Sequence, residues 1–177
     1  MKKNTFSVRR LTASAMLLAA GLLLPFLTGQ IQGLGRMLAP LHLPVYICGM
    51  IFGPFWGLLL GVILPVLRSA LFGMPPMFPV AVTMAFELAA YGFIAGLLRE
   101  KLPKTLPMLF VSLIVSMLLG RVVWGLASLI LLGFTPNSFT WQAFITGGFI
   151  NAVPGLILQL IVVPPVVRAV EKSKLVE

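Results

Sequence analysis

Residue types that build most catalytic and metal sites are rare or missing in this chain. Its 177 residues contain one cysteine, one histidine and no aspartate. Cys48 alone cannot form a disulfide within the chain or a cysteine metal cluster. There is no HExxH motif, no convincing nucleophile–base pair, and no glycine-rich phosphate loop leading to a lysine and a serine or threonine. The sequence therefore predicts a protein that is not an enzyme, holds no metal or cofactor, and cannot hydrolyse ATP by itself.

Charge is scarce as well. Charged residues make up 10% of the chain and hydrophobic residues 59%, with a mean hydropathy of +1.07, whereas a soluble domain is about one quarter charged. Apolar runs of about 17–25 residues, long enough to cross a bilayer as helices, cover most of the sequence. The net charge of +9 lies largely in short flanks of these runs. Such flanks indicate membrane topology signals and not a nucleic-acid partner.

The sequence predicts an all-α integral membrane protein with six transmembrane helices in one compact bundle, a single membrane domain over residues 1–177. The first apolar run is interpreted as a retained helix and not as a cleaved signal peptide. Ten of the thirteen basic residues fall in the leader, the loop between the fourth and fifth helices, and the tail. Because cytoplasmic loops collect lysine and arginine, both termini are predicted to be cytoplasmic. The expected helices span approximately residues 11–28, 40–52, 55–72, 80–99, 106–133 and 140–168.

Polar side chains inside the spans mark a candidate binding pocket. Ionisable residues within a membrane are rare and face the bundle interior or a water-filled cavity. With the predicted topology, these side chains gather in the outer half of the bundle. Thr83, Glu87 and Tyr91 share one helix face because they are four residues apart. The candidate substrate-binding residues are Glu87, Arg121, Arg68, Asn151, Tyr91, Trp124, His42 and Thr83.

Structural roles for these residues are open at this point. Arg68 lies near the outer end of its helix and can anchor that helix at the membrane interface. Glu87 and one arginine can form an internal ion pair, with or without a ligand, and His42 can be satisfied at a loop end. The helix that carries Glu87 has a strip of small residues on its opposite side, predicted to pack closely against another helix: Ala81, Ala85, Ala89, Gly92 and Gly96.

Taken in order, these features resemble the substrate-binding S components of energy-coupling factor (ECF) vitamin transporters. The resemblance covers essentially the whole length: six spans, a basic leader, Ala15-x-x-x-Ala19 in the first helix, and the segment LHLPVYICGMIFGPFWGLLLGVILPVLRSALFGMPPMFP. It implies a pocket open to the outside of a bacterial cytoplasmic membrane, gated by residues 30–37, the turn over 73–79 and the loop over 134–139. It also implies a transmembrane T subunit that Ala15 and Ala19 face, and two cytoplasmic ATPase subunits.

The resemblance does not name the cargo, because S components keep one fold and bind different compounds. Two arginines and one acid slightly favour pantothenate, since arginine binds a carboxylate through two hydrogen bonds. A pyridoxine- or hydroxymethylpyrimidine-like compound stacked on Trp124 or Tyr91 fits nearly as well, and a cobalamin precursor is a third candidate. Two other functions are alternatives: a membrane scaffold or assembly protein that transports nothing, and a solitary secondary transporter.

Overall fold

The computed structural model describes residues 7–27, 39–132 and 140–173, and these ranges contain helices and no strand. In the described residues, five helical stretches are long and apolar enough to cross a membrane, whereas α3 is shorter. The prediction of an all-α, multi-pass membrane protein is confirmed, while a sixth crossing and the side on which the termini lie stay predictions. The helices are α1 (Val8–Leu27), α3 (His42–Phe52), α4 (Pro54–Phe72), α5 (Val82–Lys101), α6 (Leu106–Leu132), α7 (Trp141–Ile145) and α8 (Val153–Lys172).

Two π-helical turns adjoin these helices. One covers Met77–Ala81 and leads directly into α5. The other covers Thr146–Ile150 and joins α7 to α8. In place of the single helix expected over residues 140–168, the structure therefore has two helices with a wider turn between them. A π-helical turn inserts an extra residue into the helical repeat, so it rotates every side chain that follows.

Gly53 separates α3 from α4. Its φ of +101° lies in the region that other residues avoid. Pro54 begins α4, where its missing N–H removes no helical hydrogen bond. The chain turns back here, so α3 and α4 form a hairpin, and Pro44 of α3 and Leu64 of α4 both reach Gly21 of α1. α1 therefore lies against both helices of the hairpin.

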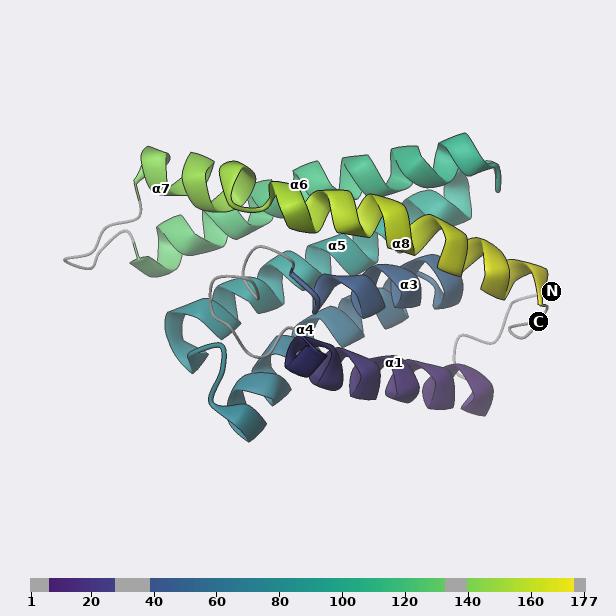
Figure 1. Cartoon of the computed structure of the whole chain (residues 1–177), viewed down its shortest axis with the longest axis horizontal. Coiled ribbons are helices and arrows are strands. Elements are labelled where there is room, and N and C mark those ends of the chain that lie inside the picture. The colour runs from purple at the N-terminus through teal and green to yellow at the C-terminus, as the bar shows by residue number, and fades with distance from the viewer. Residues whose placement is uncertain (1–6, 28–38, 133–139, 174–177) are drawn as a thin grey trace.

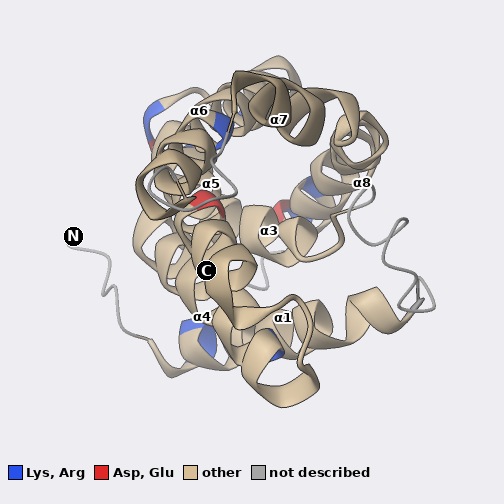
Figure 2. Cartoon of the chain, turned by 90° about the vertical axis from the view of Figure 1, so that its left-hand side faces the viewer, with Lys and Arg blue, Asp and Glu red and all other residues tan. Residues whose placement is uncertain are grey.

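Four helices close into a ring. α3 packs on α5, α5 on α6, α6 on α8, and α8 back on α3. Figure 2, viewed along the bundle, shows this ring with α1 and α4 on one side of it. One hydrophobic cluster draws its residues from the four ring helices. A second cluster joins the α3–α4 hairpin to α1 and to Leu88 of α5.

α5 meets the hairpin through glycine. A Cβ on Gly92 would lie 2.3 Å from the carbonyl oxygen of Gly57 in α4, and one on Gly96 would lie 2.6 Å from that of Gly49 in α3. These neighbours are backbone atoms and cannot rotate away, so the close approach requires glycine. The small-residue strip noted in the sequence thus forms the contact between α5 and the hairpin.

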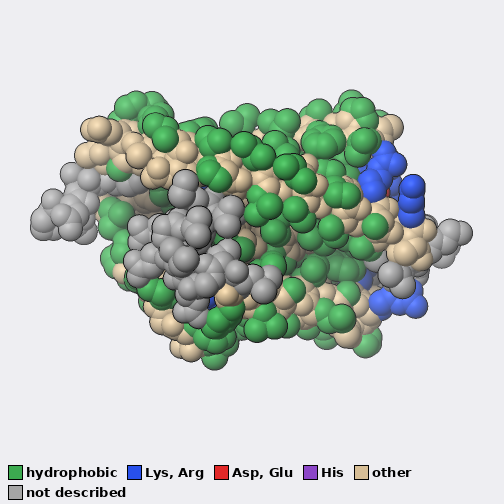
Figure 3. Space-filling view, viewed as in Figure 1, with side chains coloured by type: hydrophobic (Ala, Val, Ile, Leu, Met, Phe, Trp, Pro, Cys, Tyr) green, Lys and Arg blue, Asp and Glu red, His purple; other side chains and the backbone are tan. Residues whose placement is uncertain are grey.

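When α3 is included, successive helices from α1 to α8 run in alternating directions, so α1 begins and α8 ends at the same end of the bundle (Figure 1). At this end Arg99 of α5 donates hydrogen bonds to both carboxylate oxygens of Glu171 in α8. Arg99 Nη2 lies 2.8 Å from Glu171 Oε2, and Arg99 Nε lies 3.1 Å from Glu171 Oε1. Lysine and arginine side chains gather here, whereas apolar side chains cover most of the flank in view (Figure 3). We call it the basic end, and the distribution of basic residues predicts that it faces the cytoplasm.

Candidate substrate-binding site

Glu87 is a buried carboxylate at the centre of a polar cluster. Glu87 is 2% exposed. It precedes Arg99, which lies at the basic end, by twelve positions, so it lies about 18 Å from that end along α5. Arg121 Nη1 of α6 lies 2.7 Å from Glu87 Oε1, and the Tyr91 hydroxyl donates to the same oxygen at 2.9 Å. His42 Nε2 of α3 lies 3.8 Å from it. One carboxylate oxygen thus connects α3, α5 and α6.

Helical spacing and a glycine position these groups. Thr83, Glu87 and Tyr91 are all buried on one face of α5, and the Thr83 hydroxyl donates to the carbonyl of Val80. A Cβ on Gly120 would lie 2.2 Å from the Tyr91 ring. The ring therefore lies directly on the α6 backbone, next to Arg121, whose guanidinium carbon is 6.0 Å from the ring centre. Tyr91 in this way sets the spacing at which Glu87 and Arg121 meet.

α3 supplies two rings to the same cluster. The rings of His42 and Tyr46 each lie 5.2 Å, centre to centre, from that of Tyr91. His42 Nδ1 is 3.1 Å from the carbonyl oxygen of Ala39. A carbonyl can only accept, so this contact requires the proton on Nδ1. His42 Nε2, which faces Glu87, then carries a proton only when the imidazole is charged.

Several buried polar atoms around the cluster have no hydrogen-bond partner among the described residues: His42 Nε2, Tyr46 Oη, Arg121 Nε and, on α8, Gln159 Nε2. Buried polar atoms in proteins are nearly always paired, and leaving one unpaired costs about 1–3 kcal/mol. Gln159 is 1% exposed and precedes Val163, a member of the ring cluster, by one helical turn. The ring of α3, α5, α6 and α8 thus has hydrogen-bonding capacity for a small polar molecule.

An aromatic cluster lies beside Arg121, away from the basic end. The Trp124 and Phe144 rings stack at 6.1 Å between centres, and Phe144 also contacts Trp141 and Phe149. A Cβ on Gly148, in the second π-helical turn, would lie 3.4 Å from the Trp124 ring and 3.9 Å from Arg121 Cδ. This turn therefore packs on both side chains, and Trp124 adjoins the polar cluster as its position one turn from Arg121 implies.

Arg68 is not brought to Glu87. Its guanidinium donates to the carbonyl of Leu22 in α1 and lies between two rings, 5.2 Å from the centre of Phe26 and 5.3 Å from that of Phe72. A backbone carbonyl and two aromatic faces can stabilise a cation within an apolar bundle. Arg68 thus links α1 to α4. This contact favours the structural role considered for Arg68 over a role in substrate binding.

Asn151 is also apart from the cluster. It is exposed, whereas Gly148, Ala152, Gly155 and Gln159 are buried. The expectation that Asn151 faces the interior assumed one continuous helix, and the π-helical turn rotates the residues after it. Tyr46 and Gln159, which the sequence reasoning passed over, point inward instead. Both could have been found from the sequence, because each is a polar side chain within an apolar run.

Ala15 and Ala19 lie on the outer side of α1. Both are exposed, while Ser14, Gly21 and Pro25 are buried toward the bundle. The buried side of α1 is held by contacts such as that of Ser14 Oγ with Cys48 Sγ of α3, at 3.6 Å. The two alanines are therefore accessible to another membrane protein. The expected gating loops over residues 30–37 and 134–139 lie outside the described residues.

Comparison with known proteins identifies one family. The family model for the substrate-specific component of ECF transporters matches residues 9–167. The match extends over every described helix from α1 to most of α8 and contains all of the candidate residues above. No curated protein and no solved structure matches the chain.

Proposed function

The chain belongs to the substrate-specific components of ECF transporters, and from this premise we propose that it captures a water-soluble vitamin or vitamin precursor for uptake into the cell. Members of this family are membrane transport subunits and not enzymes, and they bind a small molecule and associate with T and ATPase subunits. The proposed pocket opens away from the basic end, on the outer side of a bacterial cytoplasmic membrane. ATP hydrolysis is assigned to the two partner ATPases.

The observation that carries the proposed site is the Glu87 cluster with its unpaired neighbours. Arg121 and the Tyr91 hydroxyl both bind the Glu87 carboxylate, so these three polar side chains are held in place before a ligand binds. Tyr46 Oη and Gln159 Nε2 are buried within the same ring of helices and have no hydrogen-bond partner in the part of the chain that the structure describes. A ligand that pairs with such groups gains hydrogen bonds inside an apolar bundle, which favours both affinity and selectivity.

The same contacts bear on the nature of the cargo. Pantothenate was favoured because two arginines were expected to bind its carboxylate. In the structure, however, Arg68 donates to α1 and Arg121 is paired with Glu87. The remaining polar atoms suit neutral groups such as hydroxyls and ring nitrogens. Trp124 is partly exposed and offers aromatic surface close by. We therefore rank a pyridoxine- or hydroxymethylpyrimidine-like compound first, pantothenate second and a cobalamin precursor third.

Replacing Tyr46 with phenylalanine, or Gln159 with leucine, is expected to weaken binding of the cognate vitamin by about tenfold, the effect of one lost neutral hydrogen bond. Native mass spectrometry of the purified chain would first identify the compound that co-purifies. Calorimetric titration of that compound without ATP would then compare the variants. Arg68→Gln is the matched control, because it removes a buried polar group outside the cluster and should keep the affinity. Wild-type affinity in both test variants would move the site elsewhere.

Replacing Ala15 or Ala19 with tryptophan is expected to reduce vitamin uptake at least severalfold and to leave binding by the isolated chain unchanged. Both alanines are exposed on α1, and a flat surface of small residues allows close approach of a second helix. Ala20→Trp, at an exposed neighbouring position, is the control. Co-purification with the T subunit measures assembly. An intact complex in both variants would contradict the proposed interface.

The two alternatives make different predictions. A membrane scaffold would lose thermal stability in the Glu87 variants and would yield no bound vitamin. A solitary secondary transporter would accumulate the vitamin in cells that lack any ATPase partner. Uptake that requires the ATPases supports the S-component assignment over both.

A further inference from the structure

A groove lies on the outside of the helix ring, and none of the residues that line it belongs to the Glu87 cluster. It has a volume of about 590 Å³ and lies between the start of α6 and the second half of α8. Its walls are apolar except at one place. Leu106 and Phe110 form the α6 side, and Ile157, Ile161 and Pro164 lead along α8 to Arg168. The groove thus runs beside about three turns of α8, and its lining has a single cation, located toward the basic end.

Arg168 is the polar feature of this groove. Its Nε is buried and has no hydrogen-bond partner among the described residues. The only acid on α8, Glu171, is held by Arg99 through both of its carboxylate oxygens. Among the described residues, Arg168 therefore has no carboxylate partner on α8 and at least one unpaired donor. A buried donor without a partner favours an anionic acceptor that can reach it.

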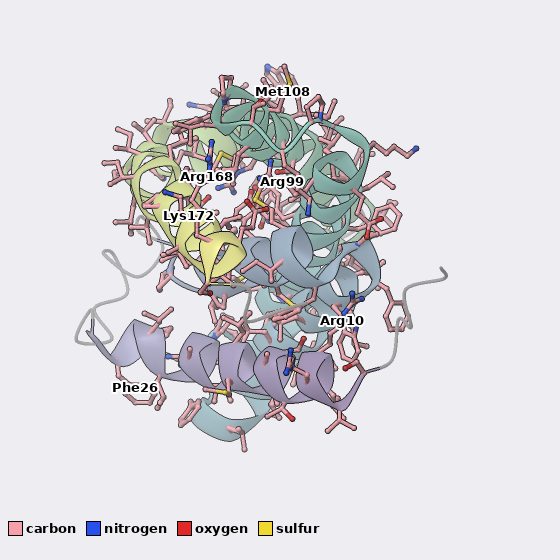
Figure 4. The ribbon with its side chains drawn as sticks, turned by 90° about the vertical axis from the view of Figure 1, so that its right-hand side faces the viewer. Arg10, Phe26, Arg99, Met108, Arg168 and Lys172 are labelled. Carbon is pink, nitrogen blue, oxygen red and sulfur yellow. The ribbon has the colours of Figure 1, made fainter. Side chains whose placement is uncertain are left out.

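The surroundings of Arg168 are also positive. Lys101 ends α5, Lys172 ends α8, and Lys104 lies between α5 and α6, so all three belong to the same end of the bundle. Figure 4 looks onto this end and shows Arg168 and Lys172 on α8, with Arg99 on α5 and Met108 on α6 around them. Basic pockets between transmembrane helices attract the headgroups of anionic lipids, and each nearby lysine or arginine adds to that attraction.

We propose that this groove binds one anionic phospholipid, with an acyl chain along α6 and α8 and the phosphate at Arg168. An amphiphilic molecule matches both parts of the groove. Its apolar chain fits the apolar walls, and its anionic headgroup fits the one cation, which lies where the groove reaches the membrane surface. The Arg168 guanidinium forms a charge-assisted hydrogen bond to a phosphate oxygen. A zwitterionic lipid offers the same chain but no net charge, so it binds more weakly.

Native mass spectrometry of the full chain in detergent tests this proposal, with dioleoylphosphatidylglycerol titrated against dioleoylphosphatidylcholine. The wild type is expected to retain one phosphatidylglycerol in preference to phosphatidylcholine. Arg168→Gln should reduce that preference by about fivefold, the scale of one basic contact with anionic lipid. Lys101→Gln, which removes a basic side chain of the same end outside the groove, should keep most of the preference.

Two further arms make the result decisive. Ile161→Trp fills the groove from a position that is 65% exposed, so the fold is retained, and it should reduce retention of both lipids. Inorganic phosphate should fail to displace phosphatidylglycerol, because the acyl chain carries part of the binding. Equal retention of the two lipids by the wild type, an unchanged preference in Arg168→Gln, or displacement by phosphate alone would overturn the proposal.

Discussion

Replacing Glu87 with leucine is expected to lower the free energy of unfolding by about 3–5 kcal/mol, because removing one partner of a buried ion pair leaves the other charge uncompensated. Arg121 Nη1 lies 2.7 Å from Glu87 Oε1, and among the described residues no second carboxylate pairs with Arg121. The Tyr91 hydroxyl loses its acceptor at the same time. Unfolding in mixed micelles of dodecyl sulfate and a mild detergent measures the change.

The double variant Glu87→Leu/Arg121→Met separates stability from binding. Replacing a buried ion pair by apolar residues of similar volume is often neutral or stabilising. The double variant should therefore regain most of the stability lost in Glu87→Leu, while vitamin binding stays absent. If it binds the vitamin with wild-type affinity, the pair serves structure alone and the proposed site is wrong.

Replacing Gly92 with alanine is expected to cost about 3 kcal/mol of stability, the upper part of the usual range for overpacking. The new methyl group would lie 2.3 Å from the carbonyl oxygen of Gly57 and 2.4 Å from its carbon. Relief requires α4 and α5 to move apart, which disturbs the packing of the α3–α4 hairpin against the ring. Thermal unfolding in detergent, followed by circular dichroism, reports the loss.

Gly21→Ala is the matched control for Gly92→Ala. Both changes occur inside a helix, where alanine is favoured over glycine by about 1 kcal/mol. The methyl group at Gly21 would meet side-chain atoms only, Leu64 Cδ2 at 2.7 Å and Pro44 Cγ at 3.0 Å, and these can shift more readily than a backbone carbonyl. We expect Gly21→Ala to change stability by less than about 1 kcal/mol, as a small overpacking term offsets the helix gain. Equal losses at the two positions would show that backbone contact is not what distinguishes Gly92.

Helical periodicity was enough to foresee much of α5. Four-residue spacing predicted that Thr83, Glu87 and Tyr91 share a face, and all three are buried together. Topology further placed Arg121 in the same half of the bundle as Glu87, where the structure pairs them. These features depend on one helix or on the depth of a residue in the membrane, and both quantities can be read from a sequence.

Features that depend on how two helices are rotated against each other could not be foreseen. Arg68 lies at the same depth in the membrane whether it faces Glu87 or α1. Its contacts with Leu22 and Phe26 result from the way α1 packs on α4. Asn151 depends on the π-helical turn before it, because one inserted residue turns the following side chains by about 100°. The sequence shows no proline or charge within that turn to signal the change.

The burial of Cys48 makes the membrane orientation directly measurable. The chain has no other cysteine, and this thiol lies between α1 and α3, fully enclosed and in contact with Ser14. A membrane-impermeant maleimide therefore meets no native thiol as long as the bundle stays folded. Cysteines introduced one at a time, at Lys104 near the basic end and at Trp141 at the other, would then report which face of the membrane each end occupies, in a wild-type background that needs no cysteine removed.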